Sequence, residues 1–524
     1  MMYTLLTGAT GLVGRYLVRD LLLNGHKLAV VVRPSKKQTP AERMEIILQH
    51  WEDELGSRLP RPVVLAGDIS DPGFGFSEED RDWVRDHVDT IIHSAAILEF
   101  YGEDRSGEPW RTNLGGTQNM IELCRELDIR DIHYVSTAYV AGTQTTVAME
   151  DALDVGQEFR NDYEHSKFLA EKAVREIDFA DHVTVYRPAV IAGDSVTGYT
   201  NTYHGIYLYL RLAALMVPAV PPDENGVRHT PIRFWMTGEE RRNVIPVEWV
   251  SAVMVRLFET PEARGGTYQM APDVPLTSGE VIRYTGDYYN STGAVLCGPP
   301  VEGVSQVARD EDEDQWLFER LYSENMGTYQ PYETSDNVFD MTNTKRFAGD
   351  IICPRIDRTV IYRYIDYGTQ DRWGKNRPQY DAPAAWACDV LAGVPAADDS
   401  QPDAVEVGVD AFGPGGGQFS LLLSDSGVSG IRRGLPDTES PVFHVPVELL
   451  VQAASGADCD AGELTSAWDG VSASQASKLT SLLVQALSAT VPARPHSPPA
   501  VTASQATIAA SQSLVAAAAA GCEH

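Results

Sequence analysis

The first fourteen residues contain the feature that most constrains the fold of this chain. A short apolar run at Tyr3–Leu6 leads into residues 7–14, which read TGATGLVG, and helical periodicity then continues to Leu23. Glycine at every third position allows a tight turn, a close approach of the backbone to a pyrophosphate, and close packing of helix on strand. The alternative is a glycine turn that binds nothing. Because the turn lies directly between a strand and a helix, we predict a dinucleotide-binding turn. Its predicted ligands are Gly8, Thr10, Gly11, Leu12 and Gly14.

Five further apolar runs follow, separated by helical patterns. They lie at Lys27–Val32, Val63–Leu65, Thr90–His93, Ile132–Ser136 and Val183–Tyr186. Continuous apolar strands that alternate with helices indicate a parallel sheet that is buried on both faces. The predicted fold class is therefore α/β, with a doubly wound parallel sheet of the Rossmann type.

The rest of the chain divides by composition. Residues 1–380 are predicted to form one dinucleotide-binding domain, with a smaller substrate region over about 189–380. Residues 381–405 are rich in Ala, Pro and Asp and are typical of a linker. Residues 406–490 predict a small, separate α+β domain, and residues 491–524 predict a disordered tail.

Composition excludes several classes of partner. The 524 residues include 42 Lys and Arg against 74 Asp and Glu, a formal net charge of −32. Such a chain offers no basic footprint for nucleic acid, and anionic membranes should repel it. The six cysteines form no C-x-x-C pair, so no metal site is expected. No signal-like segment precedes the first strand and no apolar run is long enough for a span, so a cytoplasmic protein without membrane insertion is predicted.

The end of the second predicted strand indicates which dinucleotide binds. Folds of this kind that prefer NAD(H) place an acid there, whereas an Arg accommodates the 2′-phosphate of NADP(H). Residues 32–37 read VRPSKK, with no acid and three cations. We therefore predict NADP(H), with Arg33 and Lys36 as ligands. Solvated loop charges are the alternative.

Three further positions are candidates for cofactor contacts. Asp68 follows the third strand, where a carboxylate could accept from an adenine amino group, although a plain turn residue is an equal alternative. Ala95 lies in a run of small residues that lets the backbone pass close to a cofactor. Asn113 begins a predicted helix, where it could be an N-cap or could position a lysine through water.

A tyrosine and a lysine four residues apart are the candidate catalytic pair. On a helix, Tyr163 and Lys167 lie on one face. A nearby ammonium should lower the pKa of the phenol and allow proton transfer near neutral pH. The fifth strand ends in Ser136 and Thr137, where a hydroxyl could donate to an oxygen that gains negative charge. From position alone the two hydroxyls compete for this role.

Taken in order, these motifs resemble the extended short-chain dehydrogenases/reductases. The matching strings are TGATGLVG, GDI (67–69), HSAA (93–96), NLGGT (113–117), STAYVAG (136–142), YEHSK (163–167) and YRP (186–188). The resemblance implies Thr137 as the catalytic hydroxyl and adds Ile69 and Pro188 to the cofactor ligands. It covers about residues 1–375.

Within that superfamily the chain looks most like the thioester-reductase and male-sterility (fatty acyl reductase) branch. The segments that match are FRNDY (159–163), NVIPVEWV (243–250) and FDMTNT (339–344), whereas residues 97–101, ILEFY, depart from the expected pattern. The resemblance implies an NADPH-dependent reductase of an acyl thioester, aldehyde or ketone in lipid or polyketide metabolism. A carrier-bound, CoA-bound or free small-molecule acyl substrate and a homodimer are the partners considered.

Other interpretations stay open on the residues alone. The same fold serves a hydroxysteroid or polyketide alcohol dehydrogenase and a nucleotide-sugar epimerase or dehydratase. A non-catalytic NADP(H)-binding scaffold is the third possibility. Residues 206–217 could line an acyl channel or form a buried helix, and Arg228, Arg233, Arg241 and Arg242 are candidates for a basic patch that an acidic carrier would need. Residues 417–469 faintly resemble sterol-carrier domains.

Overall fold

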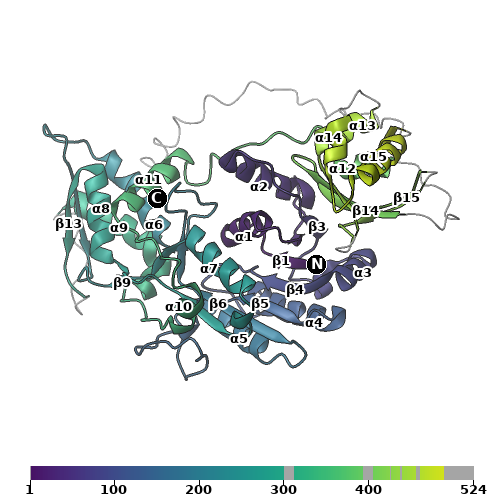
Figure 1. Ribbon diagram of the computed structural model, residues 1–524. Helices are drawn as coiled ribbons and strands as arrows, with labels where there is room; N and C mark the ends of the chain where they lie inside the picture. The colour runs from purple at the N-terminus through teal and green to yellow at the C-terminus, as the bar shows by residue number, and fades with distance from the viewer. Residues whose placement is uncertain are drawn as a thin grey trace, which may run out of the picture.

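Seven parallel strands form the central sheet of the protein (Figure 1). The computed structural model describes residues 2–299, 312–393, 405–424, 427–436, 440–455 and 461–488. The strand order is β11-β6-β5-β4-β1-β2-β3, and every pairing is parallel. The strands are β1 (Tyr3–Thr7), β2 (Leu28–Val32), β3 (Val63–Ala66), β4 (Val88–His93), β5 (Asp131–Val135), β6 (His182–Pro188) and β11 (Thr267–Met270).

Helices cover both faces of this sheet. One face packs against α1 (Leu12–Leu23), α2 (Pro40–Leu55) and α7 (Val247–Glu259), and the other against α3 (Glu78–His87), α4 (Gly116–Leu127) and α5 (Asp162–Arg175). Each face has its own buried apolar cluster, so the strands read as apolar runs with little alternation. The prediction of a doubly wound α/β fold is confirmed.

Much of the described part of residues 189–380 forms a smaller layer beside the carboxyl edge of the sheet. Its helices are α6 (Ile206–Met216), α8 (Ser278–Tyr289), α9 (Glu313–Met326), α10 (Thr342–Ala348) and α11 (Arg358–Gln370). Short strand pairs join β7 (Val190–Ala192) to β10 (Val244–Pro246), β9 (Arg241–Arg242) to β12 (Leu276–Thr277), and β8 (Arg228–Phe234) to β13 (Ser291–Leu296). Residues of α6, α8 and α11 share one apolar cluster, which holds this layer together.

Residues from Ala387 onward form a second domain with its own core (Figure 1). Its sheet has the order β16-β15-β14-β17-β18, with β14 (Val405–Phe412), β15 (Gly417–Ser424), β16 (Gly427–Arg433), β17 (Val442–Pro446) and β18 (Trp468–Asp469). The helices are α12 (Ala387–Ala392), α13 (Val447–Ala454), α14 (Ala461–Ser466) and α15 (Ala473–Ser488). The architecture is α+β, in agreement with the expectation for residues 406–490.

One part of the predicted linker is wrong. Within residues 381–405, α12 is helical, and Ala387 and Leu391 are buried in the core of the second domain. The two residues lie one helical turn apart, so a helix of six residues places both side chains against the core. Residues 394–404 and the predicted tail at 491–524 lie outside the described residues.

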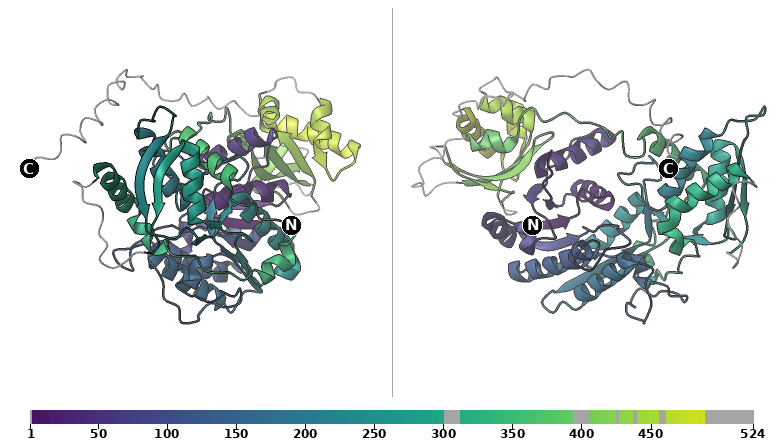
Figure 2. Two further views of the ribbon diagram at one scale, coloured as in Figure 1. Left: turned by 90° about the vertical axis from the view of Figure 1, so that its left-hand side faces the viewer. Right: turned by 180° about the vertical axis from the view of Figure 1, so that it is seen from behind.

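The second domain docks on the amino edge of the central sheet. The hydroxyl of Tyr3, at the start of β1, donates to Gln418 Oε1 at 2.8 Å and accepts from Leu435 N at 2.8 Å. Trp83 Nε1 on α3 donates to Arg433 O at 2.8 Å. In Figure 2 the second domain and the layer of α8 and α9 lie at opposite ends of the molecule. The carboxyl edge of the sheet is therefore free of this contact.

A bilayer-spanning helix is not found in the described ranges: none there combines sufficient length with sufficient apolar character.

Candidate active site

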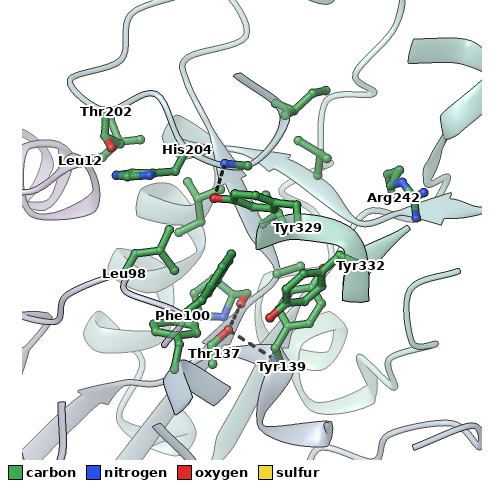
Figure 3. Close-up of a pocket in the computed structure, with 18 of the residues that line it drawn as sticks. Leu12, Leu98, Phe100, Thr137, Tyr139, Thr202, His204, Arg242, Tyr329 and Tyr332 are labelled. Carbon is green, nitrogen blue, oxygen red and sulfur yellow. Dashed lines mark hydrogen bonds between the residues drawn. The ribbon is translucent and has the colours of Figure 1, made fainter. Parts of the chain in front are cut away.

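A cavity of about 600 Å³ opens at the carboxyl edge of the sheet (Figure 3). One end is formed by the glycine turn between β1 and α1, and the other by side chains of the smaller layer. Of the predicted site residues, the cavity wall includes Gly8, Gly11, Leu12, Gly14, Thr137, Tyr163, Lys167 and Pro188. The turn and the three predicted catalytic residues therefore face one space.

The glycine turn has the geometry that a bound pyrophosphate requires. Gly8 has a φ of +77°, and a Cβ on Gly14 would lie 2.0 Å from Gly8 O. A Cβ on Gly11 would meet only Gly8 O, at 3.2 Å, so the backbone here is open on its outer side. Gly11 is the N-cap of α1 with no side-chain cap bond, and the first turn of α1 holds no acid. The N–H groups of this helix end are thus available to an anion.

Two guanidinium groups contact Thr10 of this turn. Arg15 Nε donates to Thr10 O at 3.1 Å, and Arg43 Nη2 lies 3.5 Å from Thr10 Oγ1. Arg43 Nη1 also donates to Arg33 O at 2.5 Å. Burial, then Arg33 and Arg15, lowers the pKa of Arg43. The sequence predicted Arg33 but missed Arg43, which reaches the turn because a Thr39/Glu42 capping box starts α2 beside it.

The remaining predicted cofactor ligands lie outside the cavity wall. Asp68 accepts from Ser70 N at 2.9 Å and lies 3.7 Å from Arg33, so it is both a turn residue and a partner of that arginine. Ile69 is buried against α4, where a Cβ on Gly116 would lie 2.7 Å from its Cδ1. Lys36 is exposed. Ala95 supports the turn, since its N–H donates to Thr7 Oγ1 at 3.2 Å.

Asn113 is not an N-cap, which corrects one of its two predicted roles. It lies inside the π-helical turn Arg111–Gly115 and is 1% exposed. Its side chain accepts from Ile97 N at 2.9 Å and donates to Ile97 O at 3.1 Å and Ser166 Oγ at 3.2 Å. Asn113 therefore ties the segment at Ile97, which lines the cavity, to α5.

Tyr163 and Thr137 both line the cavity, and the Thr137 side chain is close enough to act on the Tyr163 phenol. Thr137 Oγ1 lies 3.4 Å from Pro188 O and 3.3 Å from Tyr139 N, two of the dashed contacts in Figure 3. Burial raises the pKa of Tyr163 to about 12, although the interaction with Thr137 partly offsets this. The groups that act on this pKa in the structure are Thr137, Glu164 and Tyr329, and the lowering of the pKa by Lys167 stays a prediction.

The side chain of Lys167 is held by two hydrogen bonds to residues of β5. Its Nζ donates to Tyr134 Oη at 2.9 Å and to Val135 O at 2.8 Å. Burial lowers the pKa of Lys167 to about 7, and the charge of Glu171 acts in the opposite direction. Thr117 acts on the pKa of Tyr134, and its Oγ1 donates to Asn113 O at 2.7 Å. The link from Asn113 to Lys167 through water stays a prediction.

Ser136, the competing hydroxyl, is committed to another partner. It donates to Glu171 Oε2 at 2.6 Å, and Glu171 is ion-paired to Arg187 at 2.7 Å. Glu171 is fully buried, and the two guanidiniums beside it hold its pKa below the usual range despite burial. Both residues line the cavity, but the bond of Ser136 to a buried carboxylate favours Thr137 as the partner of Tyr163.

Aromatic rings form most of the substrate end of the cavity. Figure 3 shows Phe100, Tyr139, Tyr329 and Tyr332 around Thr137, and Phe100 packs edge-on against Tyr329 at 4.8 Å. Phe100 belongs to the segment 97–101 that departs from the family pattern. Residues 206–217 serve both predicted purposes, since Ile206 and Tyr209 line the cavity while Leu210 is buried. This end suits an apolar substituent.

The four candidate arginines do not form one free patch. Arg233 makes two bonds to Glu319, at 2.7 and 2.9 Å. Arg242 lines the cavity and donates to Thr334 O at 2.6 Å and Glu333 O at 3.0 Å. At least these two guanidiniums are therefore engaged within the protein.

The Rossmann sheet, the glycine turn and the Tyr, Lys and Thr at its carboxyl edge agree with the resemblance to the short-chain dehydrogenases/reductases. Residues 6–254 match the family model of an NAD-binding domain described as male sterility protein. The resemblance to the male-sterility branch of that superfamily is confirmed over these residues.

Named relatives are similar over the same region. The chain is 25% identical over 395 residues to aldehyde reductase lnaA of Aspergillus flavus, which spans 69% of this chain and 35% of that protein. It is 29% identical over 238 residues to a putative fatty acyl-CoA reductase, CG8306, of Drosophila melanogaster, covering 38% of this chain and 46% of the relative. The chain therefore spans less than half the length of either relative.

A solved structure supports the same assignment of fold. The terminal R domain of the myxalamid PKS-NRPS biosynthetic pathway superposes with a TM-score of 0.55 at 25% identity, over 72% of this chain and 93% of that domain.

Proposed function

We propose that this protein is an NADPH-dependent reductase that converts an acyl thioester, or a related aldehyde or ketone, to its reduced product. The observation that carries the proposal is that Tyr163, Thr137 and Lys167 line the same cavity as the glycine turn. Relatives named as an aldehyde reductase, a fatty acyl-CoA reductase and a terminal R domain support this reaction class.

The residues fit a bound dinucleotide. The open backbone at Gly11 and the uncapped end of α1 would hold the pyrophosphate, and Arg33 and Arg43 would hold a 2′-phosphate. The chemistry that bound NADPH supplies is transfer of a hydride to the carbonyl carbon.

Two side chains of the protein would bind and protonate the carbonyl oxygen of the substrate. Thr137 donates a hydrogen bond to it as negative charge develops, and Tyr163 donates a proton. A pKa of about 12 keeps the Tyr163 phenol protonated at neutral pH, so it is ready to act as the acid. With a thioester, the resulting hemithioacetal loses its thiol and leaves an aldehyde. Thioester, NADPH and one proton thus give aldehyde, thiol and NADP⁺.

Substitution of Tyr163 tests the reaction directly. We expect Tyr163→Phe to lower kcat by about 10²- to 10⁴-fold, because the proton donor is lost while the ring remains. NADPH oxidation would be followed with panels of acyl thioesters, aldehydes and ketones, and products would be identified by mass spectrometry. Tyr268→Phe is the matched control, since that buried phenol donates to Ala263 O and is absent from the cavity wall. Unchanged activity in Tyr163→Phe would refute the proposal.

Cofactor preference is a separate test. We expect a higher kcat/KM with NADPH than with NADH, and Arg43→Ala should raise the Kd for NADPH by about tenfold while leaving that for NADH nearly unchanged. Arg125→Ala on α4, an exposed arginine paired with Asp178, is the control. A preference for NADH in the wild-type protein would contradict the assignment of NADP(H).

A further inference from the structure

A second, smaller cavity lies directly behind the substrate end of the active-site cavity. Its volume is about 70 Å³, and it lies among α6, α8, α9 and the β8–β13 pair. Its wall is mainly apolar and includes Leu212, Met216, Ile232, Ala294 and Phe318. No residue of the glycine turn and none of the three catalytic residues contributes to it.

One layer of side chains separates the two cavities. Tyr209, Phe234, Ile282 and Tyr322 line both of them, and we call these four residues the partition. They come from four different elements: α6, β8, α8 and α9. Because the same side chains face both spaces, removing one of them would join the cavities.

The partition is held by specific contacts. Tyr322 packs edge-on against Phe234 at 5.2 Å, with an interplanar angle of 86°, and Phe234 packs against Tyr209 at 6.2 Å. The Tyr322 hydroxyl donates to Glu333 Oε1 at 3.2 Å, and the Thr285 side chain is close enough to Tyr209 to act on the pKa of its phenol. Ile282 makes no polar contact through its side chain, so it is the member whose loss disturbs the fewest bonds.

Resting on the proposed function, we propose that the partition sets the length of the acyl chain the enzyme accepts, by stopping the apolar end of the substrate short of the second cavity. The ligand class is an extended hydrocarbon chain, because both sides of the partition are apolar and aromatic. A chain that fills the first cavity meets the rings of Tyr209 and Tyr322, and a longer chain has no space until the partition opens.

The decisive experiment is a chain-length series in an opened and a refilled variant. Ile282→Ala truncates one of the four side chains of the partition. We expect kcat/KM for the longest straight-chain substrates to rise by about tenfold or more, while kcat/KM for short substrates stays within about twofold of the wild-type value. Adding Ala213→Phe, which projects into the second cavity only, should abolish this gain. Ile121→Ala on α4, a half-buried residue that lines neither cavity, is the matched control.

Each outcome decides the proposal. An unchanged ratio of long-chain to short-chain kcat/KM in Ile282→Ala, or a gain that survives Ala213→Phe, would overturn it. If the wild-type protein reduces no thioester or carbonyl compound, the proposed function fails, and the partition is then tested by calorimetric binding of straight-chain alcohols of increasing length. Tighter binding of long alcohols to Ile282→Ala alone would still support the partition, and equal binding would refute it.

Discussion

Tyr134 is a residue that the sequence analysis did not single out and that contacts the candidate catalytic residue Lys167. Its hydroxyl accepts from Lys167 Nζ at 2.9 Å, and the ammonium also lies 4.5 Å from the Tyr134 ring centroid. The phenol is buried, which raises its pKa well above the ordinary value, so it stays neutral and can serve as an acceptor. Tyr134 therefore acts as a positioning residue that stabilises the charged form of Lys167.

The charge of Lys167 should govern the pH profile of reduction. The groups that face it are Tyr134, Glu171, Tyr163 and His93, and burial with the charge of Lys167 lowers the pKa of His93 to about 3, so that ring stays neutral. The pKa of Lys167 itself is lowered to about 7. As pH rises through this value the ammonium is lost, and the phenolate left by Tyr163 loses its stabilising charge. We expect kcat for reduction to fall above a pH of about 7, measured by stopped-flow NADPH oxidation.

The Tyr134→Phe variant should move that fall to lower pH. Losing an acceptor of the ammonium disfavours the charged lysine, so its pKa should drop by about one further unit. We also expect kcat to decline by about tenfold near neutral pH. Tyr186→Phe is the control, because that buried hydroxyl bonds His133 Nδ1 at 2.8 Å instead. A pH profile identical to that of the wild-type protein would show that Tyr134 is structural only.

At the scale of elements, local patterns could be predicted and tertiary contacts could not. The glycine turn and the Tyr163/Lys167 spacing are fixed by neighbours in the chain, and both were found. Arg43 and Tyr134 reach the site only once α2 and β5 are packed, so no spacing reveals them. Strand β11 was missed because it reads TYQM, with a buried Gln269 in place of an apolar residue. Its Nε2 donates to Ala148 O at 2.8 Å, a partner distant in sequence, while its Oε1 is buried without a partner among the described residues.

The approach of α2 to β3 depends on a buried charge cluster. Arg61 is 3% exposed and bonds Glu45 at 2.8 Å and Glu52 at 2.5 Å, both on α2. Two further bonds join the same groups. Glu52 also accepts from Leu59 N and, at 3.4 Å, from Arg58, so Arg61 is the main counter-charge of the pair and the only guanidinium bonded to both. The cluster orients the helix that carries Arg43 to the glycine turn.

Removal of Arg61 should therefore be costly. We expect Arg61→Met to lower the free energy of unfolding by about 3–5 kcal/mol, because two buried carboxylates lose their counter-charge. Arg85→Met is the matched control: its pair with Asp82 is solvent-exposed on both sides, and the expected loss is at most about 1 kcal/mol. Guanidinium denaturation of both variants at neutral pH measures the difference. Equal losses would mean that the cluster contributes no more than a surface pair.

At the scale of the whole molecule, the candidate active site and the contact with the second domain lie at opposite edges of the central sheet. The cavity opens where β1, β4 and β5 end. The second domain instead contacts Tyr3 at the start of β1 and Trp83 on α3. Lys27 Nζ, before β2, also donates to Pro436 O at 3.1 Å on this side. The second domain therefore does not cover the substrate entrance, and its removal from the sheet should not disturb the catalytic residues.

Tyr3 lets this separation be tested by a double-mutant cycle. We expect Tyr3→Phe to cost about 1–3 kcal/mol of stability, because Gln418 and the Leu435 N–H each lose a buried partner. Gln418→Leu alone should also destabilise, and the double variant should be less destabilised than the sum, since both substitutions remove one shared bond. The kcat of all three proteins should stay within about twofold of wild type. Strictly additive losses would show that the bond does not couple the domains, and a large fall in kcat would show that docking at the amino edge reaches the catalytic edge.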